Sequence, residues 1–229
     1  KAEGRELTGI HFAMDFLKLQ NRVNSGEINS SDNPINAEGK KVLVIGGGDT
    51  GSDCVGTSIR QKAEKVTQVE ILPKPPAERT DDNPWPYYGK ILKTSSSHEE
   101  GCDRYWNISS VRFIGEDFNV KAVDIEDVEW KNTNGKYTMV PVPGSRRIME
   151  ADRVLLAMGF VHPVLEGLIT DAGLDLNLRK NIKVNDNYKT SRNKFFAAGD
   201  SISGASLVVN AIASGRKVAK EIYIYLKDN

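Results

Sequence analysis

The sequence has few cysteines, no excess of either charge and no long apolar run. Cys54 and Cys102 form no CxxC pair and no metal-ligand spacing, which argues against a disulfide scaffold or zinc site and fits a reducing cytoplasm. Thirty-one Lys and Arg balance thirty-one Asp and Glu, so nothing favours nucleic acid or an anionic membrane as partner. The apolar run at 154–158 is far too short to span a bilayer.

The start of the chain carries no targeting signal. The sequence begins at Lys1, and its first methionine, Met14, lies inside an apolar stretch. A charged, apolar and small-residue signal pattern is not present there. We therefore expect an N-terminally truncated piece of a longer cytoplasmic protein.

Hydrophobic periodicity predicts an α/β chain with an antiparallel insertion. The expected elements are a short helix within 7–19, a loop over 21–39, strands at 41–45 and 66–72 flanking a helix at 52–63, hairpins over 108–142, strands at 153–158 and 194–198, and a helix over 207–227. Five prolines exclude a regular element over 73–86.

A glycine pattern lies where the first βαβ unit turns from strand to helix. Gly46 allows the tight turn, Gly48 lets the backbone approach a pyrophosphate, and Gly51 lets helix and strand pack closely. The helix start offers unpaired N–H groups and partial positive charge. A purely structural turn is the alternative. We predict a dinucleotide site formed by Gly46, Gly47, Gly48, Asp49, Thr50 and Gly51.

The residues after the second strand bear on which dinucleotide binds. NAD sites usually place an acid about 20 residues on, at the strand end. Glu70 lies at that distance, but inside the predicted strand, before Ile71 and Leu72. Lys74 and Arg79 follow the strand and can hold a 2′-phosphate, unless they are solvated loop cations. We expect NADPH, with NADH as the alternative.

A second signal lies near the C-terminus. The predicted strand at 194–198 ends in Gly199 and Asp200, and a helix follows near Ala205. A carboxylate at a strand end can accept hydrogen bonds from ribityl or ribose hydroxyls, and the helix start can stabilise negative charge on an isoalloxazine ring. The alternative is that Asp200 simply caps a turn. The three histidines share no ligand spacing, so no metal site is expected.

Segments 9–17, 44–54, 66–79, 83–86, 155–160, 196–200 and 206–209 together carry a family resemblance over nearly the whole chain. They resemble the glutamate synthase small (beta) subunits, and the Pro-Lys-Pro-Pro to Asn-Pro-Trp-Pro stretch is the most family-specific part. The resemblance implies a flavoprotein similar in plan to thioredoxin reductase. Its α/β fold has a Rossmann-like nicotinamide-binding domain with an antiparallel β-meander insertion, plus the C-terminal part of an FAD-binding domain.

The resemblance also implies domain boundaries and site residues. Residues 1–34 are a connecting segment from the FAD domain with a short helix, 35–160 the NAD(P)-binding domain, and 161–229 the C-terminal portion of the FAD domain. It makes Asp200 the FAD-ribityl ligand. The remaining expected cofactor-binding residues are Gly159, Gly199, Ser206 and Leu207.

The implied activity is hydride transfer from NADPH to FAD, with electrons passing on to a large subunit that makes glutamate. Iron–sulfur clusters are expected only in the missing N-terminal region. No catalytic side chain is needed, because the flavin itself accepts the hydride. The isolated chain is expected to hold FAD weakly and to be inactive. The alternatives are an electron-transfer subunit of another related reductase complex and a non-catalytic dinucleotide-sensing module.

Overall fold

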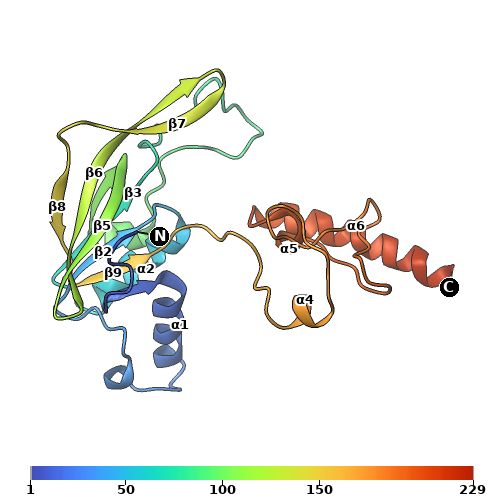
Figure 1. The fold of residues 1–229 in the computed structure, drawn as a ribbon, viewed down its shortest axis with the longest axis horizontal. Coiled ribbons are helices and arrows are strands. Elements are labelled where there is room, and N and C mark those ends of the chain that lie inside the picture. The colour runs from blue at the N-terminus through green and yellow to red at the C-terminus, as the bar shows by residue number, and fades with distance from the viewer. Residues whose placement is uncertain (1, 229) are drawn as a thin grey trace. The chain divides into compact units, whose positions relative to one another are not determined.

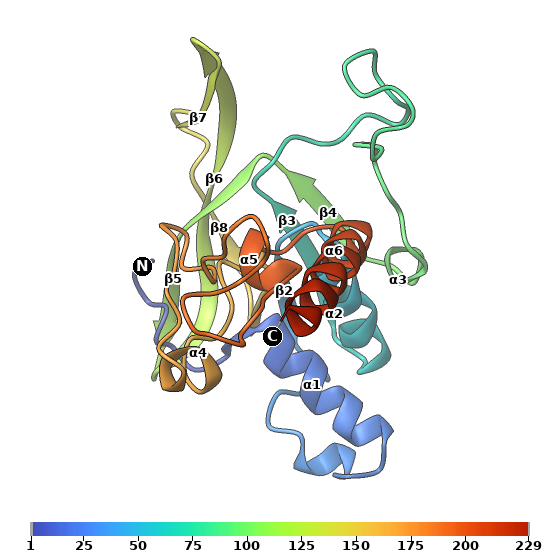
Figure 2. The same ribbon diagram turned by 90° about the vertical axis from the view of Figure 1, so that its right-hand side faces the viewer.

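The computed structural model describes residues 2–228, which divide into two units. The first unit runs up to Met158, and the second begins at Gly159 (Figures 1 and 2). None of the helices in this described part of the chain is long and apolar enough to cross a membrane.

A five-stranded parallel sheet with the order β1-β9-β2-β3-β4 forms the base of the first unit. Its strands alternate their side chains between two cores, so that Val44 packs on one face and Leu43 on the other. Burial on both faces explains why the two central segments 42–45 and 154–156 are continuous apolar runs. The strands are β1 (Ile10–Phe12), β2 (Lys41–Ile45), β3 (Lys65–Glu70), β4 (Asp103–Trp106) and β9 (Arg153–Leu156).

Two helices cover one face of the parallel sheet. Helices α1 (Ala13–Asn24) and α2 (Asp49–Arg60) pack against each other and share a core with β2, β3 and β9. Phe16 from α1 and Val55 from α2 are both completely buried in that core. Strand β1 and helix α1 therefore belong to the sheet and core of the first unit. The boundaries expected at 34 and 160 stay a prediction.

An antiparallel sheet covers the other face of the parallel sheet. Its central strand β6 (Asn119–Thr133) pairs with β5 (Ile108–Glu116), β7 (Lys136–Pro141) and β8 (Arg147–Glu150). The β6–β7 ribbon extends well beyond the rest of this sheet (Figure 2). Its two-residue turn, Asn134-Gly135, has φ of 53° and 80°, as the favoured hairpin turn requires. The inserted hairpins are therefore confirmed.

A buried carboxylate pairs with two arginines in the middle of this antiparallel sheet. The Asp124 carboxylate on β6 accepts hydrogen bonds from Arg146 Nη2 at 2.7 Å and Arg112 Nε at 3.1 Å. The hydrogen bond from Arg146, above all, lowers the pKa of Asp124. This carboxylate therefore stabilises the fold above the ordinary pKa of an aspartate, and the stabilisation is lost as the pH falls through the lowered pKa.

Replacing Asp124 by asparagine is expected to lower the midpoint of urea unfolding at pH 7, because two arginines lose their counter-charge. The variant should also lose less stability than the wild type between pH 5 and pH 3. Asp127→Asn is the matched control, since the Asp127–Arg147 pair is exposed on both sides. Equal losses from both substitutions would contradict the assignment of Asp124 as the buried anchor.

The second unit has a small core and a long helix near the C-terminus. Ile169, Leu174 and Ile182 form its buried cluster. Its helices are α4 (Leu168–Asp171), α5 (Asp200–Ser203) and α6 (Val208–Lys227), and no described residue of α6 is fully buried. The expected helix near the C-terminus is thus confirmed, although its apolar residues stay largely exposed.

The structure differs from the sequence-based expectation in several short elements. Strands β1, β4 and β8 were not expected, because three or four residues are too few to show periodicity. Helix α2 begins at Asp49, three residues earlier than expected. The segment 194–198 forms no strand and makes only a bridge between Phe196 and Lys189. A strand needs a hydrogen-bonded neighbour along its length, and the described part of this unit provides none.

Candidate functional site

The glycine turn lies at the carboxyl ends of β2 and β9. Gly46 has a φ of 126°, and a Cβ there would collide with the carbonyl oxygen of Ala157. A Cβ on Gly51 would collide with the Gly46 carbonyl and lie 2.7 Å from Gln68 Nε2. The turn therefore approaches its neighbours so closely that both positions require glycine. Such an edge is where open parallel sheets bind ligands.

The start of α2 has the space and the donors that a phosphate group needs. Gly48, the residue before the helix, is exposed, and a Cβ on it would meet nothing within 4 Å. The first helical hydrogen bond runs from the Ser52 N–H to the Gly48 carbonyl at 3.0 Å. The N–H groups ahead of Ser52, those of Asp49 and Thr50 included, are the ones that a helix leaves without an internal partner. These residues fit a bound pyrophosphate.

β3 ends at Glu70 and not at Leu72 as expected, so Glu70 lies at the end of the strand and not in its interior. Its Oε2 accepts a hydrogen bond from the Gly47 N–H at 2.5 Å, and its Oε1 accepts one from the Leu72 N–H at 3.0 Å. A Cβ on Gly47 would lie 2.7 Å from Oε2. The carboxylate thus ties the glycine turn to the end of β3.

The two predicted phosphate-binding cations have different surroundings. Lys74 is exposed, and its Nζ lies 5.0 Å from the centre of the Trp106 ring at the end of β4. Arg79 instead donates from Nη1 to the carbonyls of Asn83 at 3.2 Å and Tyr87 at 2.8 Å. Lys74 is therefore at the sheet edge near Glu70, whose register partner is Trp106, while Arg79 holds together the proline-rich loop.

The predicted flavin residues lie in the second unit. Gly199 has a φ of 65° and donates from its N–H to Ser214 Oγ on α6 at 3.0 Å. Asp200 is exposed and is the first residue of α5. Ser206 and Leu207 are exposed at the start of α6, whose first turn contains no acidic residue. A carboxylate and an uncompensated positive helix end are therefore available in this unit.

Gly159 lies apart from the features above. It is exposed at the start of the second unit, and a Cβ on it would meet nothing within 4 Å. Packing does not require glycine at this position. Its predicted role in cofactor binding stays a prediction.

Both cysteines, Cys54 and Cys102, are free thiols. Cys54 is completely buried in α2, and burial raises the pKa of its thiol to about 12. Among residues 2–228, no cluster of three or more His, Cys, Asp or Glu side chains is arranged to hold a metal ion.

Sequence reasoning missed the polar side chains behind the turn. Gln68 lies between buried residues of β3 and is itself 2% exposed, yet its Nε2 donates to the Gly46 carbonyl at 2.9 Å. His98 and Ser95 contact this amide and the start of α2. A polar residue in an otherwise apolar buried strand was the available signal for Gln68, because such a group must find a partner.

A parallel sheet with a glycine turn opening a helix at its carboxyl edge defines the class of dinucleotide-binding oxidoreductase domains. Residues 6–215 match the family model described as pyridine nucleotide-disulphide oxidoreductase. The chain belongs to this family.

Sequence relatives narrow the comparison. The glutamate synthase [NADPH] small chain of Mycobacterium tuberculosis is 46% identical over 226 residues, covering 97% of this chain and 46% of that protein. The small chain of Bacillus subtilis is 37% identical, covering 98% and 47%. The glutamate synthase [NADH] of Saccharomyces cerevisiae is 41% identical, covering 99% and 11%. The resemblance to glutamate synthase small subunits is confirmed, and the chain spans about half the length of the small chains it matches.

Solved structures confirm the fold. Mycobacterium tuberculosis FprA in complex with NADPH is similar with a TM-score of 0.66 at 14% identity, covering 100% of this chain and 61% of that one. An FAD-dependent pyridine nucleotide-disulphide oxidoreductase from Desulfovibrio vulgaris has a TM-score of 0.57 at 23% identity, covering 95% and 49%. At such identities the likeness shows the fold alone, and the expected α/β class is correct.

Proposed function

We propose that the chain is part of a glutamate synthase small chain that takes up reducing equivalents from NADPH. The observation that carries this proposal is the 46% identity, over 97% of the chain, to a small chain named for NADPH. In that function NADPH supplies a hydride, and FAD accepts it. The proposed partner is the large subunit, which the name "small chain" implies for the relatives, and the proposed compartment is the cytoplasm.

The role of this chain's own residues is to bind and orient the dinucleotide. The proposed phosphate contacts are backbone N–H groups at the start of α2, next to the open space at Gly48. Gly46 and Gly51 keep the turn close to the sheet, and Glu70 fixes it through Gly47. Holding donor and acceptor in contact is the protein's contribution to hydride transfer.

The proposed flavin contacts come from the second unit. Asp200 would accept hydrogen bonds from ribityl hydroxyls, with Gly199, Ser206 and Leu207 near the ring. Their support is the exposed carboxylate and the start of α6, where no acidic residue offsets the helix dipole. We also propose that the second unit is the C-terminal portion of an FAD-binding domain.

The preference for NADPH is proposed to depend on Lys74. Its exposed ammonium group lies at the end of the sheet beyond Glu70, the position from which a 2′-phosphate is bound. Arg79 has a lesser proposed part, because its Nη1 already serves two loop carbonyls. The relatives named above include both NADPH and NADH forms, so cofactor choice needs its own test.

Titration calorimetry of the 229-residue chain is expected to show NADPH binding at least about tenfold tighter than NADH. One charge-assisted hydrogen bond supplies roughly 1.5–3 kcal/mol, which is about ten- to a hundredfold in affinity. Lys74→Glu should remove that preference and leave NADH binding largely intact.

Lys40→Glu is the matched control, because Lys40 is exposed and lies at the opposite end of β2 from the turn. A chain that binds neither dinucleotide would overturn the proposed function. Binding with equal affinity for both would keep the site and remove Lys74 as the selector.

A further inference from the structure

A chain of hydrogen bonds leads from the glycine turn to a histidine that the proposed function does not use. Gln68 on β3 donates from Nε2 to the Gly46 carbonyl at 2.9 Å. Its Oε1 lies 2.9 Å from Nε2 of His98. His98 belongs to α3 (Ser96–Glu99), a short helix in the connection between β3 and β4. His98, thirty residues after Gln68 in the sequence, is thus linked through the Gln68 amide to the Gly46 carbonyl in the turn.

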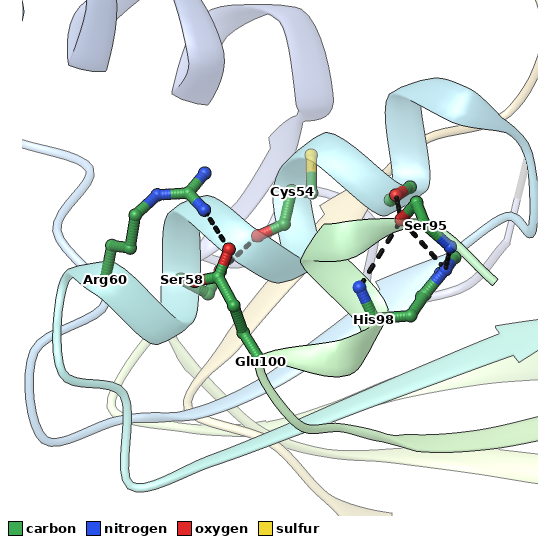
Figure 3. Close-up of polar contacts among 7 residues, drawn as sticks. Cys54, Ser58, Arg60, Ser95, His98 and Glu100 are labelled. Carbon is green, nitrogen blue, oxygen red and sulfur yellow. Dashed lines mark hydrogen bonds and ion pairs between the residues drawn. The ribbon is translucent and has the colours of Figure 1, made fainter.

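A second branch leads from the same histidine to the start of α2. His98 Nδ1 lies 3.2 Å from the backbone N of Ser95 and 3.1 Å from its Oγ (Figure 3). Ser95 Oγ is 2.5 Å from Ser52 Oγ, in the first turn of α2. The Ser52 N–H makes the first helical hydrogen bond of α2, to Gly48. The imidazole is therefore connected to both parts of the proposed phosphate site: to the glycine turn through Gln68, and to the first turn of α2 through Ser95.

The contacts fix the protonation state of the ring. The backbone N–H of Ser95 can only donate, so His98 Nδ1 must carry a lone pair. Nε2 then carries the proton and donates to Gln68 Oε1, which leaves the Gln68 NH₂ group facing the Gly46 carbonyl. Every donor in this network of hydrogen bonds has an acceptor only when His98 is neutral.

We infer that His98 is a positioning residue for the dinucleotide site, holding the Gly46 carbonyl through Gln68 and the start of α2 through Ser95 while its ring is neutral. This inference rests on the proposed function. Protonation would place a new N–H on Nδ1, directly facing the Ser95 N–H. The new Nδ1–H could donate only to Ser95 Oγ, so the Ser95 N–H would lose its acceptor. Ser95 would then shift relative to Ser52 at the start of α2, and dinucleotide affinity would fall in acid.

The surroundings of His98 favour its neutral form. Burial, and then the positive charge of Arg104 on β4, lower its pKa. From β3 and from the start of α2 the facing groups are the uncharged Gln68 and Ser52. The other charged groups nearby are Arg60 on α2 and Glu100 after α3, which pair with each other (Figure 3). Both branches are therefore fully formed above the ordinary pKa of a histidine, and the bond from the Ser95 N–H is lost as the pH falls through the lowered pKa of His98.

Three substitutions separate the branches. His98→Gln keeps a donor near the position of Nε2 and does not titrate, so it retains the branch to Gln68. His98→Asn keeps an acceptor near the position of Nδ1, so it retains the branch to Ser95. His98→Phe removes both. His162→Gln is the matched control, because that histidine lies in the second unit and contacts the carbonyl of Pro163.

The test is titration calorimetry of the 229-residue chain with NADP⁺, which unlike NADPH survives in acid, between pH 8 and pH 5. At pH 8 we expect His98→Phe to weaken binding about tenfold, and each single-branch variant to weaken it less. The wild type should lose about tenfold more affinity than His98→Gln between pH 8 and pH 5. Titration of the 2′-phosphate itself cancels in this ratio, because every variant binds the same ligand.

Two results overturn the inference alone: wild-type affinity in His98→Phe at pH 8, or the same pH profile in the wild type and His98→Gln. A wild-type chain that binds no NADP⁺ at pH 8 overturns the proposed function, and this inference with it. If His98→Phe fails to fold, the pH profiles of the wild type, His98→Gln and the control still test the inference.

Discussion

Replacing Gly51 by valine is expected to destabilise the first unit by about 3 kcal/mol and to abolish dinucleotide binding. The first atom added would overlap the Gly46 carbonyl and lie 2.7 Å from Gln68 Nε2. The carbonyl belongs to the backbone of the turn, so it cannot move away without displacing the turn itself. Urea unfolding followed by tryptophan fluorescence measures the loss of stability, and NADPH calorimetry measures the loss of binding.

Gly48→Ala is the control that separates folding from binding. The residue has an ordinary φ of −80°, and its added methyl group would meet nothing within 4 Å. Stability should therefore fall by no more than about 1 kcal/mol, the usual cost of alanine at the N-cap of a helix. Affinity should still fall, because the methyl group would occupy the space proposed for the pyrophosphate. If Gly48→Ala bound NADPH normally, the phosphate position proposed here would be wrong.

The sequence predicted the features whose causes are local. The apolar run at 41–45 and the glycines after it define β2 and the turn, because burial on both faces and backbone crowding act within a few residues. The hairpins predicted over 108–142 include the turn at Asn134-Gly135, where both positions adopt positive φ. In each case the residues that determine the structure lie close together in the sequence.

Features that depend on distant partners could not be predicted in this way. Strand β4 is four residues long and exists because β3 offers an edge to pair with. From the sequence, Glu70 could be judged only as a possible ribose-binding acid. In the structure its carboxylate accepts a hydrogen bond from the Gly47 N–H in the glycine turn, which follows a different strand. His98 became meaningful only when the fold brought it to Gln68.

The segment 194–198 shows how apolar composition can predict the wrong element. Its phenylalanine and alanine run is typical of a buried strand, but within the described residues it forms only a single bridge, between Phe196 and Lys189, flanked by hydrogen bonds to Tyr188 and Thr190. Phe196 instead packs edge-on against Tyr225 of α6, with ring centres 5.5 Å apart. Composition indicates a tendency to pair, whereas pairing itself requires a neighbouring strand.

A substitution in helix α1 is expected to cause a second large loss of stability, and it also tests where the first unit begins. Phe16 is completely buried in the core shared by α1, α2 and the parallel sheet. Truncating a buried phenylalanine to alanine typically costs about 3–5 kcal/mol, because contacts are lost and a cavity remains. We therefore expect Phe16→Ala to lower the free energy of unfolding of the first unit by that amount.

Tryptophan fluorescence makes the measurement specific, because Trp85, Trp106 and Trp130 all lie in the first unit. Met14→Ala is the matched control on the same helix, where the side chain is 48% exposed and its loss should cost less than about 1 kcal/mol. A connecting segment that folds only with another domain would tolerate both substitutions equally. A large loss confined to Phe16→Ala would instead show that α1 is part of the core that supports β2 and the glycine turn, and that the first unit begins before residue 35.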